Sequence, residues 1–126
     1  ESLNETWETL RELLTEKGVL IVAVPNCSSY DAKRYGEYWA AYDVPRHLWH
    51  FTPGTIQQLA SRHGFIMAAR HPMPFDAFYV SMLSEKHRGS SCSFLKGVFA
   101  GTLAWFNALG RKERSSSMIY VFRKKR

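Results

Sequence analysis

Apolar side chains recur every three or four positions over residues 3–14, and this spacing predicts an amphipathic helix. Gly18 follows the helix, where a glycine commonly ends one. Residues 19–24 (VLIVAV) then form an unbroken aliphatic run that ends at Pro25. A short aliphatic run between glycine and proline predicts a strand buried on both faces, as in a parallel sheet. The order helix, glycine turn and apolar strand is one step of an α/β fold.

The segment 26–51 follows this strand and has no clear periodicity. Connections of this length within a compact domain are usually functional or disordered. Its aromatic content argues against disorder, because disordered segments are poor in aromatic residues. Six aromatic residues precede Phe51 in this segment: Tyr30, Tyr35, Tyr38, Trp39, Tyr42 and Trp49.

Regular patterns return after Phe51. Thr52 is a favourable N-cap with Pro53 at the first helical position, and Gly64 follows the end of the same pattern. Apolar stripes predict two further helices, and short β-prone runs predict strands before and after them. The predicted elements are a helix over 52–63, a strand over 65–69, helices over 75–83 and 94–109, and a strand over 118–122.

The chain has 126 residues, of which 45% are hydrophobic and 14% aromatic, and this predicts one α/β domain with a true core. We divide it into a helix–strand–loop–helix–strand portion (1–71), a helical insertion (72–117) and a last strand with a basic tail (118–126). The formal charge of +6 comes entirely from residues 111–126, where seven basic residues stand against one glutamate. A nucleic-acid surface would instead spread Lys and Arg over one face. We therefore expect no nucleic-acid partner.

Two further features bear on where the protein works. Cys27 and Cys92 are too few for a disulfide framework and lack C-x-x-C spacing, which favours free thiols in a reducing, cytoplasmic compartment. The acidic start, without Met or a secretory signal, predicts an excised piece or a processed product. The apolar stretch 94–110 is interrupted by Lys96 and Asn107 and falls short of the ~20 residues of a bilayer span. We therefore expect no stable membrane insertion.

The chemistry-bearing side chains concentrate in the aromatic loop. They combine a carboxylate, a guanidinium and two imidazoles with aromatic neighbours, which is a common composition for a ligand pocket. Ligands of open α/β sheets bind beyond the carboxyl ends of strands, and this loop leaves that end of the strand over 19–24. The candidate site residues are Tyr38, Trp39, Asp43, Arg46, His47 and His50.

Three interpretations of the two histidines stay open. With Asp43 they would form a metal site, but Pro45 disrupts the helix that would align them and a fourth ligand is not evident. The imidazoles would otherwise hydrogen-bond to loop carbonyls beneath an aromatic lid. Alternatively His47 or His50 would be a general base, because imidazole titrates near neutral pH. The residues favour the last two interpretations equally, and both over the metal site.

Two segments resemble a known family. They are ETLRELLTEKGVLIVAVPN (residues 8–26) and the motif Tyr38-Trp39 followed by DVPRHLWHFTP (residues 43–53). The first is similar to the helix and aliphatic strand that open the last third of class I S-adenosylmethionine-dependent methyltransferases. The second is similar to a motif of one bacterial branch of that family, where a helix ending near a Gly-Phe pair follows, as at Gly64. The resemblance covers nearly the whole chain.

The resemblance implies a fold, namely the C-terminal part of a Rossmann-like methyltransferase. Residues 19–24, 65–69 and 118–122 would be the fifth, sixth and seventh strands. The seventh strand would lie antiparallel between the other two, giving a small mixed sheet in the order five-seven-six. The insertion over 72–117 would shape the substrate side.

The resemblance also implies a methyl transfer from S-adenosylmethionine to a small-molecule or macromolecular acceptor, with a small molecule favoured. His47 or His50 would be catalytic, as a base or an orienting group. Cofactor-binding residues cannot be carried over, because the sequence has no G-x-G loop and no matching ribose-binding acid. We therefore expect this chain alone to be inactive. Substrate-binding roles would fall to Tyr38, Trp39, Asp43 and Arg46.

Other classes of function compete with this enzyme. One is a non-catalytic binding or interaction module derived from the same fold. Another is a membrane-surface protein that uses residues 94–109 and the basic tail. If the fourth strand is missing, the edge of the strand over 19–24 is open, and we expect self-association through it.

Overall fold

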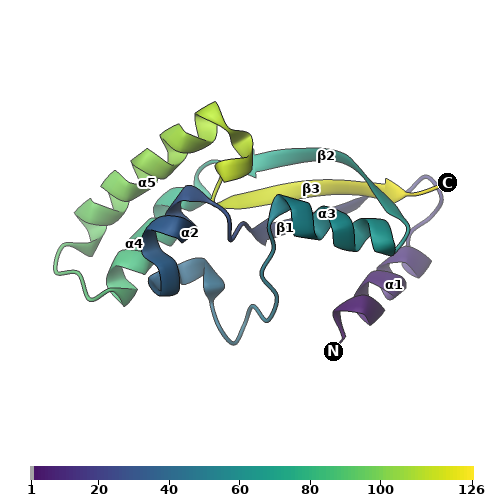
Figure 1. Cartoon of the computed structure of the whole chain (residues 1–126), viewed down its shortest axis with the longest axis horizontal. Coiled ribbons are helices and arrows are strands. Elements are labelled where there is room, and N and C mark those ends of the chain that lie inside the picture. The colour runs from purple at the N-terminus through teal and green to yellow at the C-terminus, as the bar shows by residue number, and fades with distance from the viewer. Residues whose placement is uncertain (1) are drawn as a thin grey trace.

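The computed structural model describes residues 2–126, and Glu1 lies outside the described residues. A sheet of three strands carries α1 and α3 on one side, while α2, α4 and α5 lie beyond one end of the strands (Figure 1). The strands are β1 (Leu20–Pro25), β2 (Phe65–Met73) and β3 (Ser117–Lys124). The α-helices are α1 (Leu3–Leu13), α2 (Tyr30–Tyr35), α3 (Pro53–Arg62), α4 (Asp76–His87) and α5 (Ser93–Gly110). Short 3₁₀-helices are η1 (Gly36–Tyr38), η2 (Ala40–Tyr42) and η3 (Lys112–Arg114).

The last strand of the chain, β3, lies between β1 and β2 and runs antiparallel to both. This confirms the order expected from the sequence, with the strand over 118–122 in the middle. The expectation of a mixed sheet is wrong for the described residues. The strands β1 and β2 do run in the same direction, but β3 separates them, so each neighbouring pair is antiparallel.

The strand β1 is buried on one face only, which corrects the expectation that both faces are covered. Leu20, Val22 and Val24 pack against the core beneath α1 and α3. Successive side chains of a strand point to opposite faces, and Ile21 on the second face is 66% exposed. Ile66 of β2, which is 49% exposed, shows the same lack of cover.

The core between the sheet and its two helices is largely aromatic. Trp7 of α1 meets Phe65 and Phe122 edge to face, with ring centroids 5.5 Å and 5.6 Å apart. Such edge-to-face contacts are favourable beyond the area they bury. This single tryptophan therefore fixes α1 against both β2 and β3. The other fully buried members of this cluster are Ile56, Ala60, Met118 and Tyr120.

The strand β2 extends to Met73, four positions beyond the predicted strand over 65–69. A β-bulge lies between Met67 and Ala69, and the pairing with β3 then continues through Pro72. Proline cannot donate a ladder hydrogen bond, so it is tolerated on an edge strand. Among the described residues β2 pairs with β3 alone, which explains why Pro72 does not end it.

The second edge of β1 carries no strand among residues 2–126. A single parallel bridge joins Asn26 to Phe51 beyond the end of the strand, so the long loop covers this corner and leaves the rest open. An open edge of this kind presents unpaired N–H and C=O groups. Self-association through it stays a prediction.

Helices α4 and α5 form an antiparallel pair, which we call the α4–α5 hairpin. Small residues of α5 line the contact between the two helices. A Cβ atom added to Gly97 would lie 2.5 Å from the Cα of Met82, and one added to Gly101 would lie 2.8 Å from the Cα of Phe78. The two backbones are therefore in direct contact. None of the helices within residues 2–126 has both the length and the apolarity that crossing a bilayer requires.

Replacing Gly97 with Ala should lower the free energy of unfolding. The added methyl group would overlap the α4 backbone, which costs about 1–3 kcal/mol and outweighs a gain in helix propensity of up to ~1 kcal/mol. Urea unfolding would measure the change. Gly110→Ala is the matched control, because a Cβ there meets no atom within 4 Å. Equal stability of the Gly97→Ala variant and the wild type would contradict the close backbone contact.

A second prediction concerns Tyr120, which is 1% exposed at the centre of the sheet. Burial raises the pKa of Tyr120 to about 12, with Arg70 opposing the shift and Cys27 and Glu113 adding to it. An unfolded tyrosine has a pKa of about 10, so the unfolded chain loses this proton first as the pH rises. The stability from Tyr120 is thus fully present below about pH 10 and is lost between about pH 10 and pH 12.

The loss across this window should amount to about 2–3 kcal/mol. Urea unfolding at a series of alkaline pH values would show a steep decline for the wild type and a shallower one for Tyr120→Phe. Burial also raises the pKa of Tyr35, with Glu85 adding to the shift, so part of the decline should remain in that variant. Identical pH profiles for the two proteins would contradict the assignment.

Candidate functional site

The carboxyl end of β1 is closed by the side chain of Asn26, which is 1% exposed. Its Nδ2 donates to the carbonyl oxygens of Glu113 and Ser115 at 2.7 Å and 3.0 Å. Its Oδ1 accepts from the backbone N–H of Ser28 at 3.1 Å and from the Ser28 hydroxyl at 2.7 Å. A single amide therefore joins the start of the long loop to the segment that enters β3.

A buried carboxylate holds the middle of the same loop. Asp31, which is fully buried, accepts from Trp39 Nε1 at 2.8 Å and from the Ser116 hydroxyl at 2.6 Å, both through Oδ2. Ser29 caps α2 by accepting from the N–H of Ala32 at 3.1 Å. The sequence has no periodicity in this segment, because α2 is only six residues long. The Ser29 cap and the hydrogen bonds of Asp31 stabilise it.

The two histidines of the candidate site both bind loop carbonyls. His47 Nδ1 lies 3.1 Å from the carbonyl oxygen of Ala41, and His50 Nε2 lies 3.0 Å from that of Tyr42. A carbonyl only accepts, so each of these ring nitrogens must carry its proton. In the neutral ring the other nitrogen then has a free lone pair, namely Nε2 of His47 and Nδ1 of His50. The geometry thus accommodates a structural role and a general-base role together.

A pocket of about 250 Å³ lies between this loop and α4, beside the end of β1, and we call it the Asp43 pocket. The loop contributes three of the predicted site residues, and α4 contributes a carboxylate, an imidazole and an apolar wall. The lining residues are Pro25, Ala40, Ala41, Asp43, Arg46, His47, Asp76, Tyr79, Val80, Leu83 and His87.

The other predicted site residues lie elsewhere. Trp39 is 1% exposed and belongs to the core, so its indole supports the loop through Asp31 and offers no surface to a ligand in this structure. Tyr38 is 43% exposed and does not line the pocket. His50 also lies outside the lining and stands edge-on to Tyr42, with ring centroids 4.9 Å apart.

Asp76, Tyr79 and His87 of α4 were missed by the sequence analysis. Their only signal was their position in the segment 72–117, which the resemblance placed on the substrate side. Asp76 is held by the Ser117 hydroxyl, which donates to Oδ2. It therefore connects the first turn of α4 to the start of β3.

The pocket brings charges of both signs together at its mouth. Arg46 Nη1 lies 3.1 Å from Asp43 Oδ2, and the Arg46 side chain is 81% exposed. Asp43 has a left-handed backbone with φ of 40°, a conformation that Asp and Asn tolerate better than most residues. Exposed ion pairs are readily exchanged for other partners, so Arg46 is free to bind an anionic group. No three His, Cys, Asp or Glu side chains within residues 2–126 converge to hold a metal ion.

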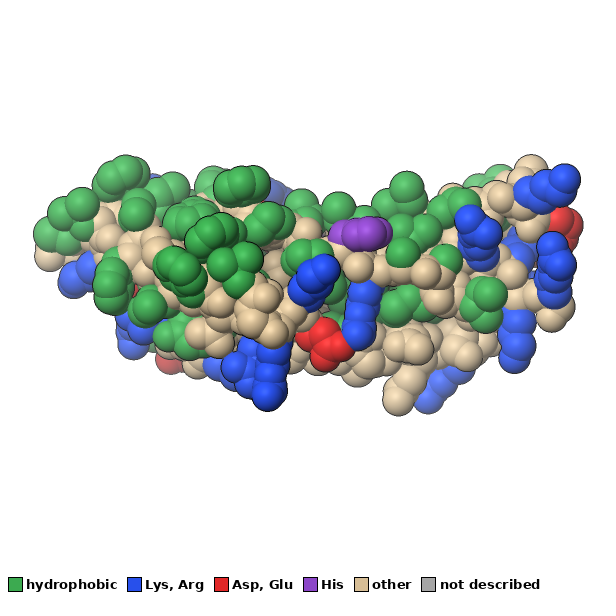
Figure 2. Space-filling view, turned by 90° about the horizontal axis from the view of Figure 1, so that it is seen from above, with side chains coloured by type: hydrophobic (Ala, Val, Ile, Leu, Met, Phe, Trp, Pro, Cys, Tyr) green, Lys and Arg blue, Asp and Glu red, His purple; other side chains and the backbone are tan. Residues whose placement is uncertain are grey.

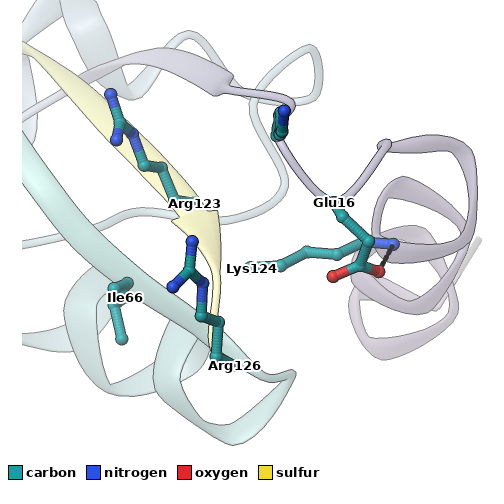
Figure 3. A pocket seen from close by; sticks show the side chains of 6 residues that line it. Glu16, Ile66, Arg123, Lys124 and Arg126 are labelled. Atoms are coloured by element: carbon teal, nitrogen blue, oxygen red, sulfur yellow. Dashed lines mark hydrogen bonds and ion pairs between the residues drawn. The ribbon is translucent and has the colours of Figure 1, made fainter.

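A larger hollow of about 540 Å³ lies at the opposite end of the sheet, where Arg123, Lys124 and Arg126 approach Glu16 and Ile66 (Figure 3). Lys124 Nζ lies 3.4 Å from Glu16 Oε1. This hollow contains no imidazole, and it lies at the amino end of β1, away from the edge where ligands of α/β sheets bind. We therefore take the Asp43 pocket as the candidate functional site.

The chain matches no protein-family model, no curated protein and no solved structure. Its function is therefore inferred from its own residues and geometry.

Replacing Asp31 with Asn should destabilise the protein by about 1.5–3 kcal/mol. The amide oxygen of the variant can still accept from Trp39 and Ser116, but the acceptor is no longer a carboxylate, and an NH₂ group is buried where Oδ1 has no partner. Chemical denaturation monitored by tryptophan fluorescence would measure the loss. Asp43→Asn is the matched control, because it breaks only an exposed ion pair worth at most ~1 kcal/mol. Similar losses for both variants would contradict a central role of Asp31.

Proposed function

We propose that this chain is the C-terminal, substrate-facing part of an S-adenosylmethionine-dependent methyltransferase, and that the Asp43 pocket binds the methyl acceptor. The observation that carries the proposal is the sheet order. The last strand, β3, is inserted antiparallel between β1 and β2, which themselves run in the same direction. This is the arrangement that the resemblance implies for the fifth, seventh and sixth strands.

The sheet order is informative because it is not the simplest one available. Consecutive strands lie side by side in most sheets, and a chain of three strands would ordinarily form a meander. Here β1 and β2 are consecutive but unpaired, and the strand between them comes last. The helix α3 connects these two strands, as expected for a Rossmann-like fold.

Each side of the pocket suits part of an acceptor. Arg46 would bind an anionic group, while Tyr79, Val80 and Leu83 form an apolar wall. His47 donates through Nδ1 to Ala41, so its Nε2 is available to take the proton from an attacking hydroxyl or amine. The proton would stay on His47, which leaves the lone pair of the acceptor free.

The described residues do not fit the cofactor itself. Backbone amides approach a nucleotide-type cofactor closely only where glycines open the turn after a strand. The turn after β1 has no glycine, and the Asn26 side chain fills it with four hydrogen bonds. The methyl donor would therefore be held by residues outside this chain, and we derive no step that uses it.

A non-catalytic binding module is the second candidate. It is favoured by one observation, namely that the Asp43 pocket is formed although the sequence has no G-x-G cofactor loop. A module of this kind would bind its ligand without S-adenosylmethionine and without further strands.

The test measures S-adenosylhomocysteine release by the full-length gene product, with a small-molecule extract of the source cells as the acceptor pool. His47→Gln should lower turnover by about a hundredfold or more, because a general base contributes on the order of 10²–10⁴. His63→Gln is the matched control, since His63 follows the end of α3, does not line the pocket and bonds Asn4 at 3.1 Å.

Two outcomes would count against the proposal. Full turnover in both His47→Gln and His50→Gln would remove the histidines from the chemistry. If the wild-type protein neither binds S-adenosylmethionine nor releases product, the methyltransferase proposal is wrong and the binding module is favoured.

A further inference from the structure

Helix α5 has its small residues inside and its large apolar residues outside, the reverse of an ordinary surface helix. Phe94, Leu95 and Phe99 are each more than 60% exposed. Phe106 and Leu109 continue this face toward the end of the helix, at 59% and 61% exposed. The buried face of α5 consists of Gly97, Ala100, Gly101, Ala104 and Ala108.

This orientation is fixed by packing and cannot be reversed by rotating the helix. The backbone of α4 fills the space beside Gly97 and Gly101, where even a methyl group would overlap Met82 or Phe78. The large side chains therefore have no room on the inner face. Their exposure is a consequence of the close contact between the two helices.

The exposed face belongs to a wider apolar surface at one end of the molecule. Phe75 and Tyr79 at the start of α4 add to it, at 79% and 60% exposed. Figure 2 shows hydrophobic side chains gathered over the end formed by the α4–α5 hairpin, with Lys and Arg more frequent at the opposite end. Monomeric soluble proteins rarely leave so large an apolar patch open, so it is expected to have a partner.

The exposed charges along α5 and at its two ends, between Glu85 and Glu113, have one sign. The sequence has no Asp or Glu between Glu85 and Glu113. Glu85 itself is buried and accepts from the Tyr35 hydroxyl at 3.1 Å. Five exposed cations lie in the same stretch: Lys86, Arg88, Lys96, Arg111 and Lys112.

The outer face of α5 has few polar side chains, and two of them bond within the chain. The Thr102 hydroxyl donates to the carbonyl of Val98 at 2.8 Å, and Asn107 Oδ1 accepts from Arg114 at 3.2 Å. Protein interfaces usually carry about one hydrogen bond per 100–200 Å², and the outer face of α5 offers few groups for them. Binding to the acyl chains of a lipid membrane requires no hydrogen bonds, and anionic headgroups attract the flanking Lys and Arg side chains.

We propose that the outer face of α5, together with Phe75 and Tyr79, docks on the surface of an anionic lipid membrane. The helix would lie in the plane of the interface, with its phenylalanine and leucine side chains among the acyl chains. The cations at both ends of the helix would contact headgroups. The Lys96 side chain would reach the same layer from within the helix.

Co-sedimentation of the purified chain with vesicles tests this proposal. Vesicles of equal parts phosphatidylcholine and phosphatidylglycerol should pellet the chain, and vesicles of phosphatidylcholine alone should pellet much less. The double variant Phe94→Ser with Phe99→Ser should bind about tenfold more weakly or worse. These side chains are exposed, so the variant is expected to fold, and circular dichroism would check this.

Ile21→Ser is the matched control, because Ile21 is 66% exposed on the open face of the sheet, away from α5. It should bind like the wild type. Absence of binding to the anionic vesicles would overturn the proposal, and so would loss of binding in Ile21→Ser alone. Concentration-dependent light scattering that Phe94→Ser with Phe99→Ser abolishes, without vesicle binding, would assign the face to a second copy of the chain instead.

Discussion

The fold depends on β3 filling the space between two strands that do not touch each other. Without β3, the strands β1 and β2 share no backbone hydrogen bond among the described residues, and Trp7 loses its contact with Phe122. The strand also carries Met118 and Tyr120 into the centre of the core. The C-terminal end of the chain thus completes a structure whose first element begins at Leu3. This pairing spans most of the sequence, which makes it costly in loop entropy and dependent on the aromatic core.

The same strand positions the Asp43 pocket. The Ser116 hydroxyl donates to the carboxylate of Asp31, the Ser117 hydroxyl donates to that of Asp76, and the carbonyl of Ser115 accepts a hydrogen bond from Asn26 Nδ2. Three consecutive serines therefore attach both walls of the pocket, the long loop and α4, to the start of β3. The geometry of the pocket thus depends on the position of this strand in the sheet.

Local sequence patterns predicted where the strands are. The exposure and the pairing of these strands depend on long-range packing, which local patterns do not encode. The apolar run over 19–24, between Gly18 and Pro25, correctly predicted the strand β1. It did not predict that one face of β1 is exposed, because this depends on which helices pack against the sheet. The order of the strands came from the resemblance, because periodicity says nothing about pairing. The loop residues Asp43, Arg46 and His47 were found from their chemistry and do line one pocket. The contribution of α4 was not found, because a helical stripe gives no sign of the loop it will face.

The hydrophobic cluster of the sheet and that of the helices differ in the size of their side chains. The helical cluster lies next to both the Asp43 pocket and the α4–α5 hairpin. The sheet cluster packs large aromatic and aliphatic side chains. The helical cluster is rich in alanine, and its helices α4 and α5 approach closely at Gly97 and Gly101. Close contact of this kind leaves little freedom for one helix to move without the other. Tyr79 lies both in the lining of the Asp43 pocket and in the exposed apolar surface. Tyr79 is therefore the residue at which the wall of the pocket and the exposed apolar surface meet.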